Sequence, residues 1–160
     1  MDICKAIYNR CAHLVDNYDN RVSSLGINGS GYESRVKHLE GTTIILEEDF
    51  SSDDKDDFFS LYIFNRNDNN ELESYIKVSG DKDYVVLSGY KNLEDGTTKE
   101  IKYEAKEENE YIEASIDNEE TKIVDPYYVM DSISQLSFDK LFDRLPIYQK
   151  QKTRIKKGTH

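Results

Sequence analysis

Apolar residues recur every three or four positions along residues 2–25, which is the spacing of one face of an α-helix. The members of this series are Cys4, Ile7, Cys11, Leu14, Tyr18, Val22 and Leu25. Asp2 is suited to cap the start of the helix, and Gly26 supplies a signal for its end. Asn17 and its polar neighbours disfavour helix. The pattern therefore predicts an amphipathic helix that is either continuous or broken near Asn17.

From residue 32 to residue 124 the pattern consists of short β-prone runs separated by polar turns. The predicted strands cover residues 32–39, 42–46, 58–65, 74–79, 84–90, 99–106, 111–116 and 121–124. The Asp95-Gly96 pair is a hairpin signal, because the left-handed backbone of such a turn favours glycine. Connections this short join antiparallel neighbours, so the series predicts a meandering antiparallel sheet.

Residues 58–64, FFSLYIF, form the most apolar stretch of the chain. Apolar side chains fall on both faces of the expected strand, with Phe58, Tyr62 and Phe64 on one face and Phe59, Leu61 and Ile63 on the other. Two apolar faces are typical of a buried strand. We therefore expect this strand to be central and covered on both sides.

Pro126 ends the expected sheet and is compatible with the first turn of a helix. Apolar residues at helical spacing then predict two short helices, over residues 127–136 and 137–145, with Ser137 as a cap and Pro146 as the stop. The predicted fold class is α+β. A mostly antiparallel meandering sheet is flanked by an N-terminal amphipathic helix and short C-terminal helices.

The length of 160 residues fits one domain, which we place at residues 1–148, followed by a basic flexible tail at residues 149–160. The tail carries five bases and no acid. Residues 1–148 contain the remaining 16 bases and all 32 acids, so their net charge is −16, compared with −11 for the whole chain. Such a body repels nucleic acid and anionic membranes and attracts basic protein surfaces.

The acids cluster in two runs, of which the first, residues 47–57, directly precedes the apolar strand. We interpret this run as a loop that faces a partner. The candidate partner-binding residues are Glu47, Glu48, Asp49, Asp53, Asp54, Asp56 and Asp57. The second run comprises Glu107, Glu108, Glu110, Glu113, Glu119 and Glu120.

The two cysteines, Cys4 and Cys11, are seven residues apart, or about 10 Å along a helix, which is too far for a disulfide. We expect reduced thiols on a buried face. No apolar run has the length of a signal peptide core or of a membrane span. These features favour a cytoplasmic protein, in the host cytoplasm if it is encoded by a phage.

No motif for catalysis, metal binding or cofactor binding is visible. Cys4, Cys11 and His13 are ligand types for zinc, but on a helix His13 points about 200° away from Cys11 and no fourth ligand follows. The acids of residues 49–57 lack the glycine of a calcium-binding loop. The GINGSG segment at residues 26–31 follows a helix instead of preceding one, so it lacks the geometry that binds phosphate. We expect no cofactor, no metal site and no catalytic residue.

In its size, its acidity and its bias toward Asn, Asp, Lys, Glu, Ile and Tyr, the chain resembles small phage and mobile-element inhibitors, notably anti-CRISPR proteins. The resemblance lies in the general character of the whole chain and carries over no residue-level site. It implies a DNA-mimicking inhibitor of a basic nucleic-acid-processing enzyme, such as a CRISPR Cas nuclease. The body itself is then expected not to bind nucleic acid.

Three alternatives remain open from the sequence. A toxin-immunity protein is also small, acidic and cytoplasmic, and differs only in its partner. A small enzyme or ligand-binding domain uses a pocket between sheet and helices, for which the sequence offers no convergent set of polar residues. In the third alternative, the bases of residues 150–157 contact nucleic acid while the body binds protein.

Overall fold

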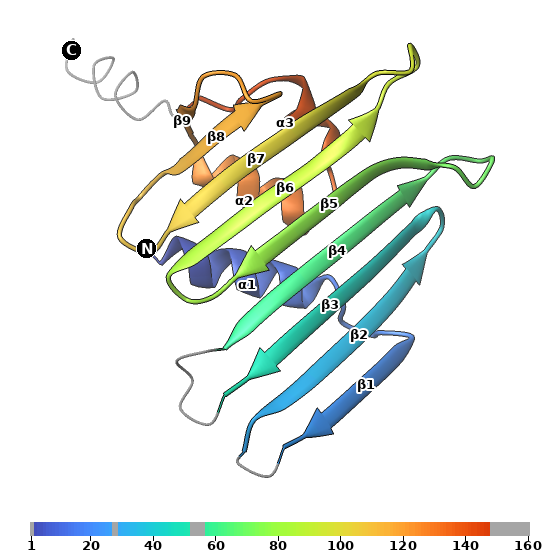
Figure 1. Cartoon of the computed structure of the whole chain (residues 1–160), viewed down its shortest axis with the longest axis vertical. Helices are drawn as coiled ribbons and strands as arrows, with labels where there is room; N and C mark the ends of the chain where they lie inside the picture. Colours follow the sequence, from blue (N-terminus) through green and yellow to red (C-terminus); the bar gives the residue numbers. More distant parts are fainter. Residues whose placement is uncertain (1, 27–28, 52–56, 148–160) are drawn as a thin grey trace, which may run out of the picture.

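The computed structural model describes residues 2–26, 29–51 and 57–147. Nine strands form one antiparallel sheet in which each strand pairs with the next along the chain (Figure 1). The strands are β1 (Asn20–Leu25), β2 (Gly31–Leu39), β3 (Thr42–Phe50), β4 (Phe58–Arg66), β5 (Leu72–Gly80), β6 (Tyr84–Asn92), β7 (Thr98–Lys106), β8 (Ile112–Ile116) and β9 (Lys122–Val124). The helices are α1 (Ile3–His13), α2 (Pro126–Ser134) and α3 (Asp139–Asp143). The fold is mostly sheet, with a few short helices, in agreement with the predicted α+β class.

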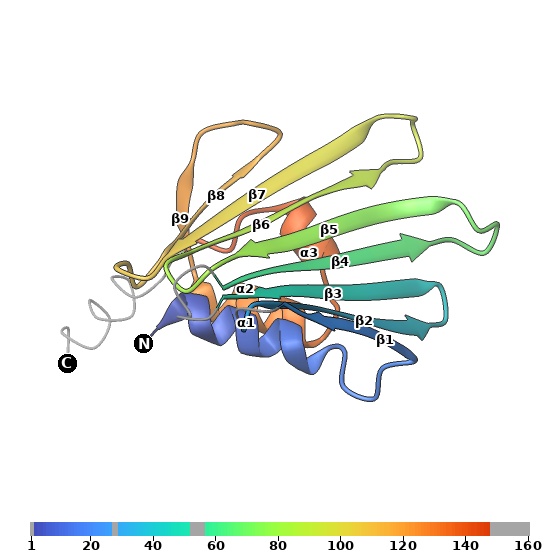
Figure 2. The same ribbon diagram turned by 60° about the horizontal axis from the view of Figure 1, so that its bottom comes forward.

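All three helices lie on the same face of the sheet (Figure 2). Helix α1 packs against α2 and against β6 and β7, and α3 packs against β7. The core lies between these helices and every second residue of strands β3–β8, and includes Ile44, Leu46, Leu61, Ile63, Ile76, Val78, Leu87, Tyr103 and Ile112. No helix of the described ranges covers the other face, which we call the open face.

Strand β4 lies in the interior of the sheet, as predicted, but only one of its faces is covered. Phe59, Leu61 and Ile63 are buried beneath the helices. On the open face Phe58 is 45% exposed, and Tyr62 and Phe64 are half-buried. The expectation of a strand covered on both sides was therefore wrong.

Aromatic side chains of neighbouring strands shield one another on the open face. The rings of Phe64 and Tyr75 lie 5.1 Å apart, and those of Tyr75 and Tyr90 lie 5.6 Å apart. Lys77 Nζ lies 5.5 Å from the centre of the Tyr62 ring, within the range of a cation–π contact. These cross-strand contacts explain how β4 has a second apolar face without a second layer.

The helix predicted over residues 2–25 is correct only as far as His13. The break near Asn17 is present, since Asn17 adopts a left-handed conformation with φ of 57°. The chain then enters β1, held there by the Asp19 carboxylate, which accepts a 2.6 Å hydrogen bond from the His38 backbone N–H. Val22 and Leu25, placed by the helical pattern on the buried stripe, are 64% and 87% exposed.

The other predicted elements are present, with bounds that are longer, shorter or shifted. Strand β3 continues to Phe50, so residues 47–49 belong to a strand and not to a loop. The two C-terminal helices are confirmed, and Pro126 occupies the first turn of α2. The residue that caps α3 is Phe138 instead of Ser137, and no side-chain hydrogen bond caps this helix.

The environment of the thiols agrees with the sequence, since Cys4 and Cys11 are free and buried on α1. None of the helices in the described ranges combines the length and apolar character needed to cross a membrane. Residues 149–160, for which a basic tail is predicted, lie outside the described residues.

Candidate functional site

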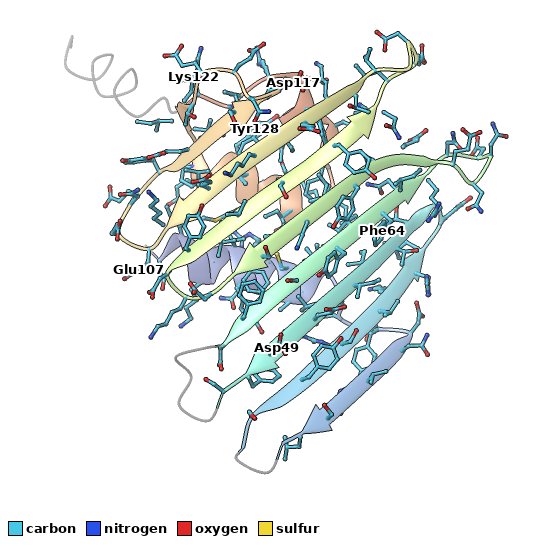
Figure 3. The ribbon with its side chains drawn as sticks, viewed as in Figure 1. Asp49, Phe64, Glu107, Asp117, Lys122 and Tyr128 are labelled. Carbon is cyan, nitrogen blue, oxygen red and sulfur yellow. The ribbon has the colours of Figure 1, made fainter. Side chains whose placement is uncertain are left out.

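Alternate connections of a meander lie at the same end of its sheet, and this topology brings distant acids together. The β3–β4, β5–β6 and β7–β8 connections share one end with the first turn of α1 (Figure 1). We call this region the acidic end, defined by the described residues Asp2, Asp49, Asp57, Asp81, Asp83, Glu107 and Glu108. Asp49 and Glu107 lie along the same side of the molecule in Figure 3. The start of the second acidic run thereby joins the end of the first.

The negative charge of the acidic end affects the pKa of the Cys4 thiol. Its pKa is raised from 9.0 to about 12, first by burial and then by the negative charges of Asp2, Asp81, Asp83 and Glu107. Four carboxylates from three segments therefore act on one buried atom. The same shift keeps the thiol protonated near neutral pH, so Cys4 is not an activated nucleophile.

A pocket of about 270 Å³ opens at the acidic end, between α1 and the edges of β3, β4 and the β5–β6 turn. Its aromatic walls are Tyr8, Phe50, Phe58 and Phe59. Its charged lining consists of Asp2, Lys5, Glu48, Asp49, Asp57, Asp81 and Lys82. An apolar cavity is thus surrounded by more carboxylates than ammonium groups.

Glu48 is the one carboxylate of the described residues that is nearly fully buried, with 6% of its surface exposed. Its Oε1 accepts hydrogen bonds of 2.9 Å from both Tyr8 Oη and Arg35 Nη2. Burial, and then the negative charge of Glu48, raise the pKa of Tyr8 to about 12. Glu48 therefore joins α1 to β2 and β3, and Arg35 compensates its charge.

Three other carboxylates of the acidic end stabilise the backbone. Asp2 caps α1 by accepting a 3.0 Å hydrogen bond from Lys5 N–H. Asp81 accepts from the N–H groups of Asp83 and Tyr84, at 2.8 and 3.0 Å, and shapes the β5–β6 turn. Asp57 accepts a 2.7 Å hydrogen bond from the backbone N–H of residue 51.

Four exposed carboxylates of the acidic end make no hydrogen bond or ion pair within the described part of the chain. They belong to Asp49, Asp83, Glu107 and Glu108. Because they have no structural partner there, they are the groups best placed to meet a basic surface.

The structure separates the residues that the sequence singled out. Glu47 is half-buried on the open face of β3, Glu48 is buried on the helix-covered face, and Asp49 is exposed at the acidic end. Asp57 also lies at this end, whereas Asp53, Asp54 and Asp56 lie outside the described residues. The sequence interpretation missed Asp81, Asp83 and the aromatic pocket, and it did not join Glu107 and Glu108 to the first run. The sequence did contain a signal for this grouping, because alternate connections of a predicted meander lie at the same end of the sheet.

The opposite end of the sheet also carries acids but differs in chemistry. Glu119 and Glu120 of the second run lie there, and the adjacent pocket of about 290 Å³ has mainly polar walls, which include Lys102, Glu104 and Glu113. The acidic end, in contrast, combines free carboxylates with a pocket that has aromatic walls. Within residues 2–26, 29–51 and 57–147, no three side chains of His, Cys, Asp or Glu are grouped so as to hold a metal ion.

In comparisons with protein-family models, curated proteins and solved structures, no match to this chain was found. The function is therefore inferred from the site. An apolar pocket inside a negative rim suits the apolar stem and cationic head of an arginine or a lysine. It also suits an apolar side chain that is surrounded by basic residues.

Proposed function

We propose that this chain is an acidic inhibitor that binds a basic nucleic-acid-processing enzyme and covers its nucleic-acid-binding surface. A CRISPR Cas nuclease is the target that the general resemblance implies. The observation that carries the proposal is the aromatic pocket at the acidic end, which Asp49 lines and which shares this end of the sheet with the free carboxylates of Asp83, Glu107 and Glu108.

Charge and burial have different roles in this arrangement. Enzymes that bind nucleic acid neutralise phosphates with Lys and Arg, and exposed carboxylates attract the same side chains. Such long-range attraction raises the association rate more than the affinity. Affinity comes mainly from a few well-buried anchors within a polar rim. The walls formed by Tyr8, Phe50, Phe58 and Phe59 can receive such an anchor.

The test removes charge without touching the carboxylates that shape the fold. The test variant carries Asp49→Asn, Asp83→Asn, Glu107→Gln and Glu108→Gln. The control removes the same charge from exposed positions at the opposite end and carries Glu71→Gln, Glu94→Gln, Glu119→Gln and Glu120→Gln. Each protein is used to capture targets from a lysate of the native host at low and high salt, and the association rate and activity of the captured enzyme are then measured.

A basic nuclease that the wild type and the control bind and inhibit is the expected target. The test variant should associate at least about 10-fold more slowly at low salt, and the difference should shrink as salt screens the charges. Equal association of both variants would exclude the acidic end as the binding site. Capture of a toxin domain would instead assign the chain as an immunity protein.

A further inference from the structure

The two edges of the sheet are protected very differently. Strand β9 has only three residues, and its last residue, Val124, forms an antiparallel bridge with Ile147 on the outer side of the strand. Strand β1 has six residues, all of them exposed, and among the described residues its strand pairing is with β2 alone. Proteins usually protect such an edge with a bulge, a proline or charged side chains. Strand β1 has no bulge and no proline, and its one charged residue, Arg21, pairs with Glu33 of β2.

The backbone groups on the outer side of β1 can be assigned from its pairing with β2. Gly26 N–H donates to the carbonyl of residue 30, and the Val36 carbonyl, opposite Asn20, accepts from Asp19 N–H. Hydrogen-bonded and non-hydrogen-bonded pairs alternate in an antiparallel ladder. Asn20, Val22 and Ser24 therefore direct their N–H and C=O groups toward β2. Arg21, Ser23 and Leu25 direct theirs outward, where they are free to pair with another strand.

The side chains and the charge of this edge favour a second copy of the same chain. Val22 and Leu25 are 64% and 87% exposed, so apolar surface is available for burial. Residues 18–39 contain two acids and three bases, whereas the rest of the chain has a net charge of −12. The β1–β2 ribbon therefore adds little to the charge repulsion between two copies of this acidic protein.

We propose that two copies pair through β1, antiparallel and about a two-fold axis at Val22, so that their two sheets become one continuous sheet. In this register Val22 faces Val22 of the second copy, and Arg21 faces Ser23 of the second copy. The outward N–H and C=O groups of Arg21 and Ser23 then form the hydrogen-bonded pairs. The valines form a non-hydrogen-bonded pair, in which side chains approach most closely.

Cysteine cross-linking tests the register. In a non-hydrogen-bonded pair the Cα atoms are about 4.5 Å apart, within the range of a disulfide, so Val22→Cys should cross-link two copies under mild oxidation. In Ser24→Cys, the matched control, the new thiols lie roughly 13 Å apart and should not cross-link. Cys4 and Cys11 are buried and stay reduced in both variants. Absence of the Val22→Cys cross-link, or equal cross-linking of both variants, would overturn the register.

Sedimentation equilibrium from low to high micromolar concentration tests the dimer itself. The wild type should form a dimer, and Val22→Lys should be monomeric because it places two ammonium groups in contact. Ile123→Lys, at an exposed apolar position on the opposite edge that is 46% exposed, should remain a dimer. A monomeric wild type, or a Val22→Lys variant that still dimerises, would refute pairing through β1. Circular dichroism confirms that each variant is folded.

Discussion

Two adjacent glutamates of the first acidic run have different roles, because successive residues of a strand face opposite sides of the sheet. Glu48 is buried and accepts from Tyr8 and Arg35, whereas Glu47 is half-buried on the open face. Glu48→Ala should lower the free energy of unfolding by about 2 kcal/mol, since it leaves Arg35 and Tyr8 without their shared acceptor. Glu47→Ala should change it by less than about 0.5 kcal/mol. Urea unfolding of both variants checks this, and equal losses would contradict the assignment.

A second residue-scale prediction concerns the pocket wall. Phe58 is 45% exposed, so Phe58→Ser should cost less than about 1 kcal/mol of stability. If the pocket receives an anchor of the target, the same change should weaken binding about 30-fold at every salt concentration. Tyr127→Ser on α2, where the side chain is 59% exposed, is the control and should leave binding unchanged. Titration calorimetry at two salt concentrations separates this effect from charge. Unchanged affinity of Phe58→Ser would show that the pocket does not contribute.

At the scale of elements, the β5–β6 turn depends on a glycine. Gly80 has φ of 156°, and a Cβ there would lie 2.1 Å from the backbone oxygen of Tyr84, which cannot move without breaking the turn. Gly80→Ala should therefore destabilise the protein by about 3 kcal/mol. Gly96→Ala, where φ is 87° and the space is open, should cost only about 1 kcal/mol for its left-handed backbone. Thermal and urea unfolding measure both changes, and a similar cost at the two positions would contradict the role of the close contact.

The elements also show where sequence patterns stop being informative. Strand positions from β2 onward followed from apolar alternation and turn residues, because pairing in a meander is local. The strand conformation of residues 20–25 did not follow from the pattern, since Val22 and Leu25 continue the helical spacing. The hydrogen bond between Asp19 and His38 that holds the chain in β1 is a tertiary contact. The burial of Glu48 follows from the alternation of β3, because Glu48 faces the same side as Ile44 and Leu46. The predicted strand ended at residue 46 and so did not include it.

The candidate site was predictable only in part, because it depends on how the elements of the whole molecule are arranged. The sequence identified Asp49 and Asp57 as acids near a core strand. The convergence of Asp83 and Glu107 with them depends on which connections share an end of the sheet. The aromatic pocket depends on where α1 crosses that end, which no local pattern specifies.

The whole molecule should also become less stable in alkaline solution. Burial raises the pKa values of Cys4 and Tyr8 to about 12, and those of Cys11 and Tyr103 also rise. The unfolded chain then loses these protons first, so stability is complete below about pH 9 and declines as pH rises from there toward 12. Urea unfolding between pH 8 and pH 10.5 should show a falling midpoint. Tyr8→Phe should flatten the decline above pH 10, and a midpoint independent of pH would contradict these shifts.

The contact between α1 and α2 joins the first helix of the chain to one of the last elements. Each strand can pair with its predecessor as soon as it leaves the ribosome, but the apolar face of α1 waits for α2 before it is fully covered. The element made first is therefore fully covered only after all nine strands have been made. The thiol of Cys11 is fully buried on α1, so its labelling during synthesis would time the covering of this helix.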